Sequence, residues 1–129
     1  MATPNPAPGF KLFPNHTLEV EPAGVRVRVT YRGEVIADSK NAIRMKEGEG
    51  PKTVAPAVYY IPRADVKMDR LVRSKQESYC PFKGKAAYYS FKDGPEDAVW
   101  SYEAPYDEFR AIKELVSFYP NKVDAITTD

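Results

Sequence analysis

The sequence is poor in the two side chains that most often ligate metals in proteins. Its 129 residues include one cysteine, Cys80, and one histidine, His16. A single cysteine excludes an internal disulfide and any zinc cluster built from several thiolates. A single histidine argues against a metal site built from histidines and against a histidine-centred triad with ligands to spare. We therefore expect neither a bound metal nor a cofactor.

An excess of charge and long hydrophobic runs are also missing. Nineteen basic and eighteen acidic residues leave a net charge of +1, which favours neither nucleic acid nor an anionic membrane as a partner. No apolar run approaches the ~18 residues of a membrane-spanning helix. The first ten residues, MATPNPAPGF, lack the charged and apolar regions of a signal peptide. These features predict a cytoplasmic protein with no nucleic-acid and no membrane partner, and they leave its oligomeric state open.

The common catalytic motifs are absent as well. The sequence contains no GxGxxG, Walker loop, HExxH, CxxC or GxSxG pattern. Proline, in contrast, is frequent, with 12 residues in the chain. Several of them stand in residues 1–14, which we expect to form a poorly ordered N-terminal arm. The length then predicts one domain over residues 15–129.

The clearest structural pattern is a β-hairpin. In residues 25–31, VRVRVTY, apolar side chains alternate with polar ones, and an Arg-Gly turn leads to residues 34–38, EVIAD. A two-residue turn pairs Val27 with Asp38, which puts a carboxylate on the apolar face. There Asp38 would need a donor or an open pocket. In the alternative, the strand has already ended and Asp38 forms a local turn with the next residue.

Further segments complete a mainly-β pattern. Strand-like composition recurs in residues 41–47, 57–61, 85–91, 98–103 and 115–119. Short helices are expected at 63–72 and after Pro105. Arg63, Lys67 and Arg70 share one face of the first helix, which is either solvated or holds a small anion at its start. The predicted fold is therefore a compact single domain of antiparallel sheets with one or two short helices. We expect Val25, Val27, Val29, Ile36, Tyr89 and Phe91 to be buried, and Arg26 and Arg28 to be solvated.

Aromatic residues are concentrated between residues 59 and 106. The group consists of Tyr59, Tyr60, Tyr79, Phe82, Tyr88, Tyr89, Trp100, Tyr102 and Tyr106. Tyrosine and tryptophan carry polar tips, so a core selected only for packing would contain more leucine than this chain has. An aromatic pocket with an Asp or Arg at its mouth would suit a planar or cationic small ligand. The alternative is that these rings simply fill a β-domain core.

The single thiol lies among turn residues. Residues 78–84 read SYCPFKG and place Lys83 three positions after Cys80. A nearby ammonium favours the thiolate that a catalytic cysteine needs. The only possible histidine base is His16, close to the N-terminal arm. Cys80 is therefore read as a small buried hydrophobe, with a ligand contact or a nucleophilic role as alternatives.

Four segments, taken in order, resemble a known family. They are Gly33…Ile36-Ala37-Asp38-Ser39, residues 59–66 (YYIPRADV), residues 80–84 (CPFKG) and Trp100-Ser101-Tyr102…Pro105. Over residues 15–124 the chain resembles a small, mainly bacterial and fungal family called domain of unknown function 427. The resemblance implies a fold of the β-tent type, which is similar to the methionine-R-sulfoxide reductases and to the ligand domain of cereblon. The family is sometimes labelled nucleotidyltransferase-like, a label that is not a demonstrated activity.

The resemblance also implies a set of positions without established roles. It places Asp38, Tyr60, Asp65, Cys80, Lys83, Gly84, Trp100 and Tyr102 at the positions that characterise the family. Many β-tent relatives hold zinc through two CxxC pairs, which this sequence lacks, so their metal site does not carry over. The resemblance leads us to expect a groove lined by aromatic residues where two sheets meet.

These observations favour a binding domain. We expect a small molecule or a modified residue to bind in the aromatic groove, at a site formed by Asp38, Tyr60, Arg63, Cys80, Lys83, Tyr88, Trp100 and Tyr102. The alternative is an enzyme, with redox or nucleophilic chemistry at the cysteine or a nucleotidyltransferase-like activity. A third possibility is an interaction module that uses the proline-rich arm or an edge strand.

Overall fold

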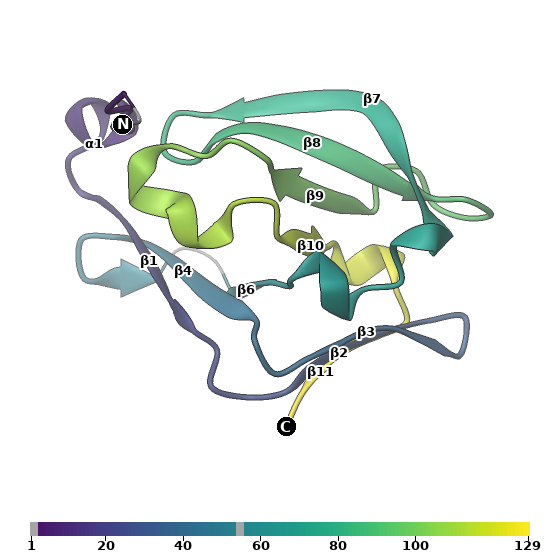
Figure 1. Cartoon of the computed structure of the whole chain (residues 1–129). Helices are drawn as coiled ribbons and strands as arrows, with labels where there is room; N and C mark the ends of the chain where they lie inside the picture. Colours follow the sequence, from purple (N-terminus) through teal and green to yellow (C-terminus); the bar gives the residue numbers. More distant parts are fainter. Residues whose placement is uncertain (1–2, 54–55) are drawn as a thin grey trace.

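Three antiparallel sheets form the chain in this computed structural model, which describes residues 3–53 and 56–129 (Figure 1). The first sheet has the order β1–β4–β5, with β6 also paired to β4, the second β10–β9–β8–β7, and the third β11–β2–β3. The strands are β1 (His16–Pro22), β2 (Val27–Tyr31), β3 (Glu34–Ser39), β4 (Ile43–Glu49), β5 (Lys52–Thr53), β6 (Val58–Tyr60), β7 (Leu71–Cys80), β8 (Gly84–Phe91), β9 (Val99–Tyr102), β10 (Val116–Phe118) and β11 (Ala125–Thr128). The described residues also form helix α1 (Gly9–Leu12) and the 3-10 turns η1 (Arg63–Asp65), η2 (Met68–Arg70), η3 (Asp107–Ile112) and η4 (Pro120–Lys122). The predicted fold class, a compact mainly-β domain of antiparallel sheets, is confirmed.

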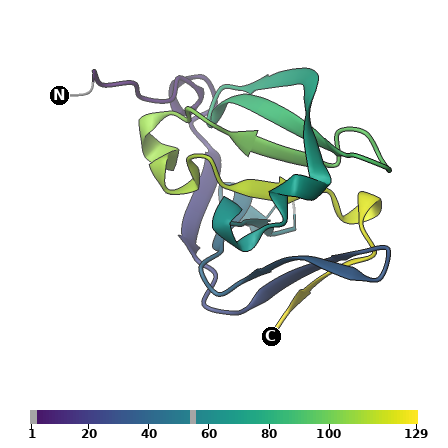
Figure 2. The same ribbon diagram turned by 45° about the vertical axis from the view of Figure 1, so that its right-hand side comes forward.

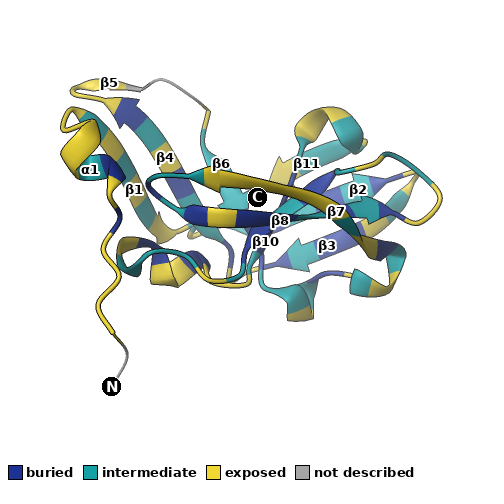
Figure 3. Cartoon of the chain, turned by 90° about the horizontal axis from the view of Figure 1, so that it is seen from above, coloured by how far each residue is buried: buried dark blue, intermediate teal, exposed yellow. Residues whose placement is uncertain are grey.

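The seven strand segments predicted from the sequence are present, with ends shifted by one or two residues. The sequence does not predict β1, β5, β7 or β11. The reason is clearest for β7, which is the edge strand of its sheet and is exposed along most of its length (Figure 3). A strand that is exposed on both faces has no apolar alternation to reveal it.

The prediction of a helix at residues 63–72 is wrong. Two single 3-10 turns occupy the segment, and Val66 between them has extended backbone geometry. Val66 forms an antiparallel bridge with Ala37, and Lys67 N donates a hydrogen bond to Ile36 O at 2.8 Å. The backbone groups of this segment therefore form hydrogen bonds with the edge strand β3, and not with one another as they would in a helix.

The predicted hairpin is present, but its register differs from the expected one. A β-bulge shifts the pairing, so that Val29 lies opposite Ala37 and Arg28 lies opposite Asp38. The extra residue of the bulge is Ile36, and both Ile36 and Ala37 are buried. A one-residue shift moves every later side chain to the other face of the strand. The prediction that Asp38 lies on the apolar face is therefore wrong.

The N-terminal arm, expected from the sequence to be poorly ordered, makes specific contacts in the structure. Asn5 N donates to Asp107 Oδ2 at 2.7 Å, and Gly9 N donates to Pro81 O at 2.9 Å. A Cβ at Gly9 would lie 2.6 Å from the Phe82 ring, so this close approach requires glycine. The first described residues of the arm, from residue 3, extend away from the sheets in Figure 2. Its helix α1 packs on the domain.

Buried side chains form two clusters. The first, here called the valine-rich core, contains Val27, Val29, Tyr31, Ile36, Ala37, Ala42, Ile61, Val66, Leu71, Tyr89, Phe91, Ala98, Val99, Val116 and Phe118. The second, here called the aromatic core, contains Met45, Tyr60, Phe82, Ala86, Tyr102, Phe109 and Ile112. Of the six side chains predicted to be buried, only Val25 is half-buried, and it packs on the valine-rich core. No helix among the described residues has both the length and the apolar composition needed to cross a membrane.

Candidate functional site

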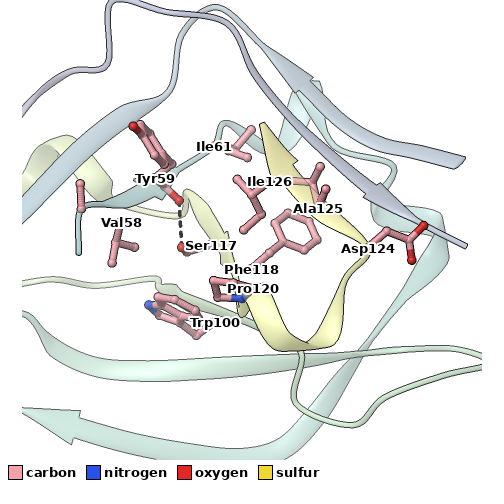
Figure 4. A pocket seen from close by; sticks show the side chains of 12 residues that line it. Val58, Tyr59, Ile61, Trp100, Ser117, Phe118, Pro120, Asp124, Ala125 and Ile126 are labelled. Atoms are coloured by element: carbon pink, nitrogen blue, oxygen red, sulfur yellow. Dashed lines mark hydrogen bonds between the residues drawn. The ribbon is translucent and has the colours of Figure 1, made fainter. Parts of the chain in front are cut away.

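A pocket of about 470 Å³ opens where side chains of the three sheets approach one another (Figure 4). Strand β6 forms one wall, β9 and β10 form another, and β2 and β11 close the third side. The residues that line it are Val29, Ala57, Val58, Tyr59, Ile61, Trp100, Ser117, Phe118, Pro120, Asp124, Ala125 and Ile126. The lining is therefore mostly apolar, with one serine and one carboxylate among its members.

The pocket exists because β6 and β10 diverge. Ile61, directly after β6, and Val116 exchange two backbone hydrogen bonds, of 2.7 and 2.9 Å. Beyond this bridge the two strands separate, and the Ser117 hydroxyl donates to Tyr59 O at 2.8 Å (Figure 4). Among the described residues, a single bridge thus joins the two strands, and the pocket lies next to it.

Trp100 connects this pocket to the aromatic core. Its indole lies at the pocket wall, with its ring centroid 4.5 Å from that of Tyr119. The indole Nε1 donates to Tyr60 Oη at 3.3 Å. Burial raises the pKa of Tyr119 to about 12, so its hydroxyl stays protonated at neutral pH. Trp100 is therefore held by contacts on the core side and offers ring surface to the pocket.

Behind Trp100, the aromatic core contains two buried tyrosines. Tyr60 is 1% exposed and Tyr102 is 7% exposed. Burial raises the pKa of both phenols, because the charged form would lose its hydration. Both side chains are therefore neutral hydrogen-bonding groups over the whole physiological pH range.

One end of the aromatic core carries a group of charged side chains. Lys83 Nζ lies 5.6 Å from the centroid of the Tyr102 ring and 3.8 Å from Glu47 Oε1. The other oxygen of that carboxylate, Oε2, lies 2.9 Å from His16 Nε2, and the His16 ring stacks on Phe82 at 4.4 Å. Lys83 is only 14% exposed, so its ammonium is stabilised by the ring face and the carboxylate together.

The structure brings together six of the eight predicted site residues. The six that lie in or against the aromatic core are Tyr60, Cys80, Lys83, Tyr88, Trp100 and Tyr102. Among these, only Trp100 also lines the pocket. Trp100 and Tyr102 are two residues apart on β9 and therefore share one face of that strand, and the rings of both lie against that of Tyr60.

Asp38 lies apart from this group, on β3 in the third sheet. Arg26 donates to both of its carboxylate oxygens, at 2.7 and 2.6 Å, and Arg28 Nε lies 3.7 Å from Oδ2. The hydrogen bond from Arg26 lowers the pKa of Asp38 below its ordinary value. The side chains of both arginines are 38% exposed, so they are partly solvated, while their charged ends lie against Asp38. Two arginines from the same hairpin therefore supply the donors that Asp38 needs.

Arg63 also lies apart, and its donors are used within the chain. Its Nη2 donates to Glu103 Oε2 and to Ser101 Oγ, both at 3.1 Å, and its Nε donates to a backbone carbonyl at 2.6 Å. Glu103 accepts further hydrogen bonds from Arg73 and Tyr89. The Arg73 contact is the main reason that the pKa of Glu103 falls to about 2. The Nε and Nη2 groups of Arg63 thus donate to acceptors within the chain.

Several residues at these sites were not singled out from the sequence. Tyr59 was counted only as one of the aromatic residues, and Ser117 and Phe118 only as part of a strand. Glu47 was covered only as the last residue of the strand-like segment 41–47. A signal for Glu47 existed in residues 41–47, since alternation places it on the same side as the buried Met45. No group of three or more His, Cys, Asp or Glu side chains in the described parts of the chain could hold a metal ion.

The fold and the pocket define a class: a small mainly-β domain whose antiparallel sheets diverge around an aromatic-walled pocket. The sequence model of the family described as domain of unknown function (DUF427) matches residues 19–129. Because the match covers most of the chain, the protein belongs to this family, as the four sequence segments indicated. A search of the curated proteins finds no match.

Proposed function

We propose that the chain binds a small, largely apolar molecule, or the side chain of a modified residue, in the pocket between β6, β10 and β11. The observation that carries the proposal is the pocket itself, about 470 Å³ in volume and walled by apolar side chains and one indole. Ligand pockets typically measure roughly 300–1,000 Å³ and have mainly apolar linings with a few polar groups. This pocket has both properties.

The lining also favours particular ligand features. Trp100, Tyr59 and Val58 are half-buried, so their pocket-facing surface is still available for contact. A planar ligand can stack on the indole, which a packed core would not leave accessible. The Asp124 carboxylate accepts a hydrogen bond from Gly33 N at 2.9 Å and is otherwise exposed at the pocket margin. A ligand with an apolar planar body and a polar or cationic end fits this arrangement.

The proposal can be tested with the intrinsic fluorescence of Trp100, because it is the only tryptophan in the chain. We would screen nucleotides, metabolites and modified amino acids for compounds that raise the melting temperature and change the tryptophan emission. A ligand at 100 times its Kd is expected to add about 2.7 kcal/mol to the free energy of unfolding. A screen in which no compound changes either signal would contradict the proposal.

A matched pair of variants locates the binding. Ala125→Leu fills part of the pocket from β11, whereas Ala111→Leu adds the same atoms at an exposed position of η3. We expect Ala125→Leu to abolish the response to a screened compound and Ala111→Leu to bind like the natural chain. Binding that survives in Ala125→Leu would place the ligand elsewhere.

Cysteine chemistry is the second candidate function. Cys80 is a partly exposed free thiol at the margin of the aromatic core, and Lys83 lies in the turn that follows it. A cation close to a thiol favours the reactive thiolate. The rate at which the native protein is alkylated distinguishes this candidate from a structural cysteine.

A further inference from the structure

Strand β10 directs one set of backbone groups towards the pocket. The backbone N–H of Tyr119 points to β9, since it donates to Ala98 O at 2.9 Å, and the backbone groups of Ser117, two residues earlier, point the same way. Val116 faces the other way and bonds to Ile61. Backbone groups alternate in direction along a strand, so those of Phe118 point to the same side as those of Val116.

The facing segment, which contains β6, follows the same alternation. Ile61 exchanges its hydrogen bonds with Val116, so Tyr59, two residues earlier, also presents its N–H and C=O to β10. The hydrogen bond from the Ser117 hydroxyl to Tyr59 O agrees with this direction. Tyr59 and Phe118 both line the pocket.

Tyr59 and Phe118 would form the next rung of the ladder if the two strands continued together. Counting two residues along each strand from Ile61 and Val116 gives this pair. Within residues 3–53 and 56–129, the bridge between Ile61 and Val116 is the only one that joins β6 to β10. The alternation points the Tyr59 N–H away from β4 and the Phe118 C=O away from β9, the strands that pair with β6 and β10. Outside the strand ladders, neither group has a backbone hydrogen bond among the described residues, so both face the pocket.

We infer that the ligand of this pocket carries a secondary amide in the trans form, which takes the place of the missing rung. The N–H and C=O of such an amide point in opposite directions, as in a peptide. Its N–H donates to Phe118 O and its C=O accepts from Tyr59 N–H, while an attached apolar group packs against Trp100. The inference rests on the proposed function, because it specifies the chemical group that the proposed ligand presents.

Matched probes test the inference. N-benzylacetamide has the donor and the acceptor, N-benzyl-N-methylacetamide lacks the donor, and benzyl acetate replaces the N–H by an ester oxygen. We would measure the Kd of each from the Trp100 emission of the full chain, with Ala125→Leu as the control for binding in the pocket. The secondary amide should bind about 3- to 10-fold more tightly than either analogue, as expected for one additional hydrogen bond.

Nuclear magnetic resonance of the labelled chain adds a readout at single atoms. With N-benzylacetamide, the Tyr59 amide proton and the Phe118 carbonyl carbon should shift downfield, and exchange of the Tyr59 N–H should slow. The Ile61 and Val116 amides are matched controls, since they are already hydrogen-bonded and should change little.

The possible outcomes separate this inference from the proposed function. Equal affinity for the three probes, or binding without a shift at Tyr59, overturns the amide inference and leaves the pocket as a binding site. The same holds if none of the probes binds while another screened compound does. If no compound of any class binds, the proposed function itself fails.

Discussion

The valine-rich core and the aromatic core are similar in depth but differ in what their side chains can do besides pack. In the valine-rich core, Val27, Val29 and Val116 offer only apolar surface and are completely buried. In the aromatic core, Tyr60 and Tyr102 are buried to nearly the same degree, although burying their hydroxyls costs free energy unless they are hydrogen-bonded. Phenylalanine would pack in their place without that cost. The valine-rich core also contains two tyrosines, Tyr31 and Tyr89, but most of its members are aliphatic, whereas Tyr60 and Tyr102 are two of only seven buried side chains in the aromatic core. Polar groups that packing alone does not require are therefore a larger share of the aromatic core.

The largest expected effect belongs to the valine-rich core. Ile36→Ala should lower the free energy of unfolding by about 2–5 kcal/mol, because Ile36 is 1% exposed and its loss leaves a cavity. The neighbouring Val35 is 40% exposed, so Val35→Ala should change the free energy of unfolding by no more than about 0.5 kcal/mol. Urea unfolding at pH 7 measures both. A cost below 1 kcal/mol for Ile36→Ala would show that the bulged hairpin does not anchor this core.

A smaller effect on stability is expected when the pH is lowered. It concerns the valine-rich core, because the Glu103 carboxylate accepts a hydrogen bond from Tyr89 of that core. The pKa of Glu103 is about 2 in the folded chain, below its ordinary value of 4.5, so the folded state binds fewer protons. Its contribution is therefore complete above about pH 5 and is lost as the pH falls towards 2. We expect the free energy of unfolding to fall by about 1–2 kcal/mol over this pH range. This loss is smaller than the pKa shift alone would give, because the carboxylate is 31% exposed and screened by solvent.

The variant Glu103→Gln should remove this acid dependence. Between pH 5 and pH 2 its free energy of unfolding should fall by less than that of the natural chain. Glu96→Gln, at an exposed position, is the matched control and should leave the slope unchanged. An equal loss of stability in all three proteins would contradict a role for the Glu103 cluster.

The next effect concerns the hydroxyl that links the aromatic core to the pocket. Tyr60→Phe removes the acceptor of the Trp100 Nε1 hydrogen bond and should cost about 0.5–1.5 kcal/mol. It should also change the tryptophan emission, because the indole loses its polar neighbour. Tyr79→Phe removes an exposed hydroxyl that pairs with Tyr106 and should leave the emission unchanged. An unaltered emission spectrum in Tyr60→Phe would show that this hydrogen bond does not hold Trp100.

The sequence predicted the valine-rich core better than the aromatic core, for a physical reason. Apolar alternation in β2 reports directly on which side chains are buried, and Val27 and Val29 were predicted correctly. The predicted register of the hairpin is wrong from Ile36 onward. A bulge depends on local backbone geometry, which the alternation of apolar and polar residues does not indicate. Asp38 was therefore assigned to the wrong face.

The candidate site was predicted in part. Residue type identified Tyr60, Trp100 and Tyr102, whose polar tips are unusual in a core, and the fold brings all three into contact. The pocket beside them depends on where β6 and β10 stop pairing, which is a property of two segments far apart in the chain. Tyr59 and Phe118 contribute backbone groups there, and the residue types in the sequence do not indicate which backbone groups face a pocket.

The smallest effect on stability is expected at Cys80. This residue also gives the most direct test of whether side chains of the aromatic core do more than pack. If the thiol only packs at the margin of the aromatic core, Cys80→Ala should change the free energy of unfolding by about 1 kcal/mol or less. Alkylation by iodoacetamide at neutral pH should be slower in the native chain than in a urea-unfolded control, because surrounding side chains restrict access to the partly exposed sulfur. A native rate well above the unfolded rate requires an activated thiolate and would favour the enzyme hypothesis. In that case Lys83→Met, which removes the ammonium but keeps an unbranched side chain, should return the rate to that of the unfolded control, whereas Lys85→Met at an exposed position should not.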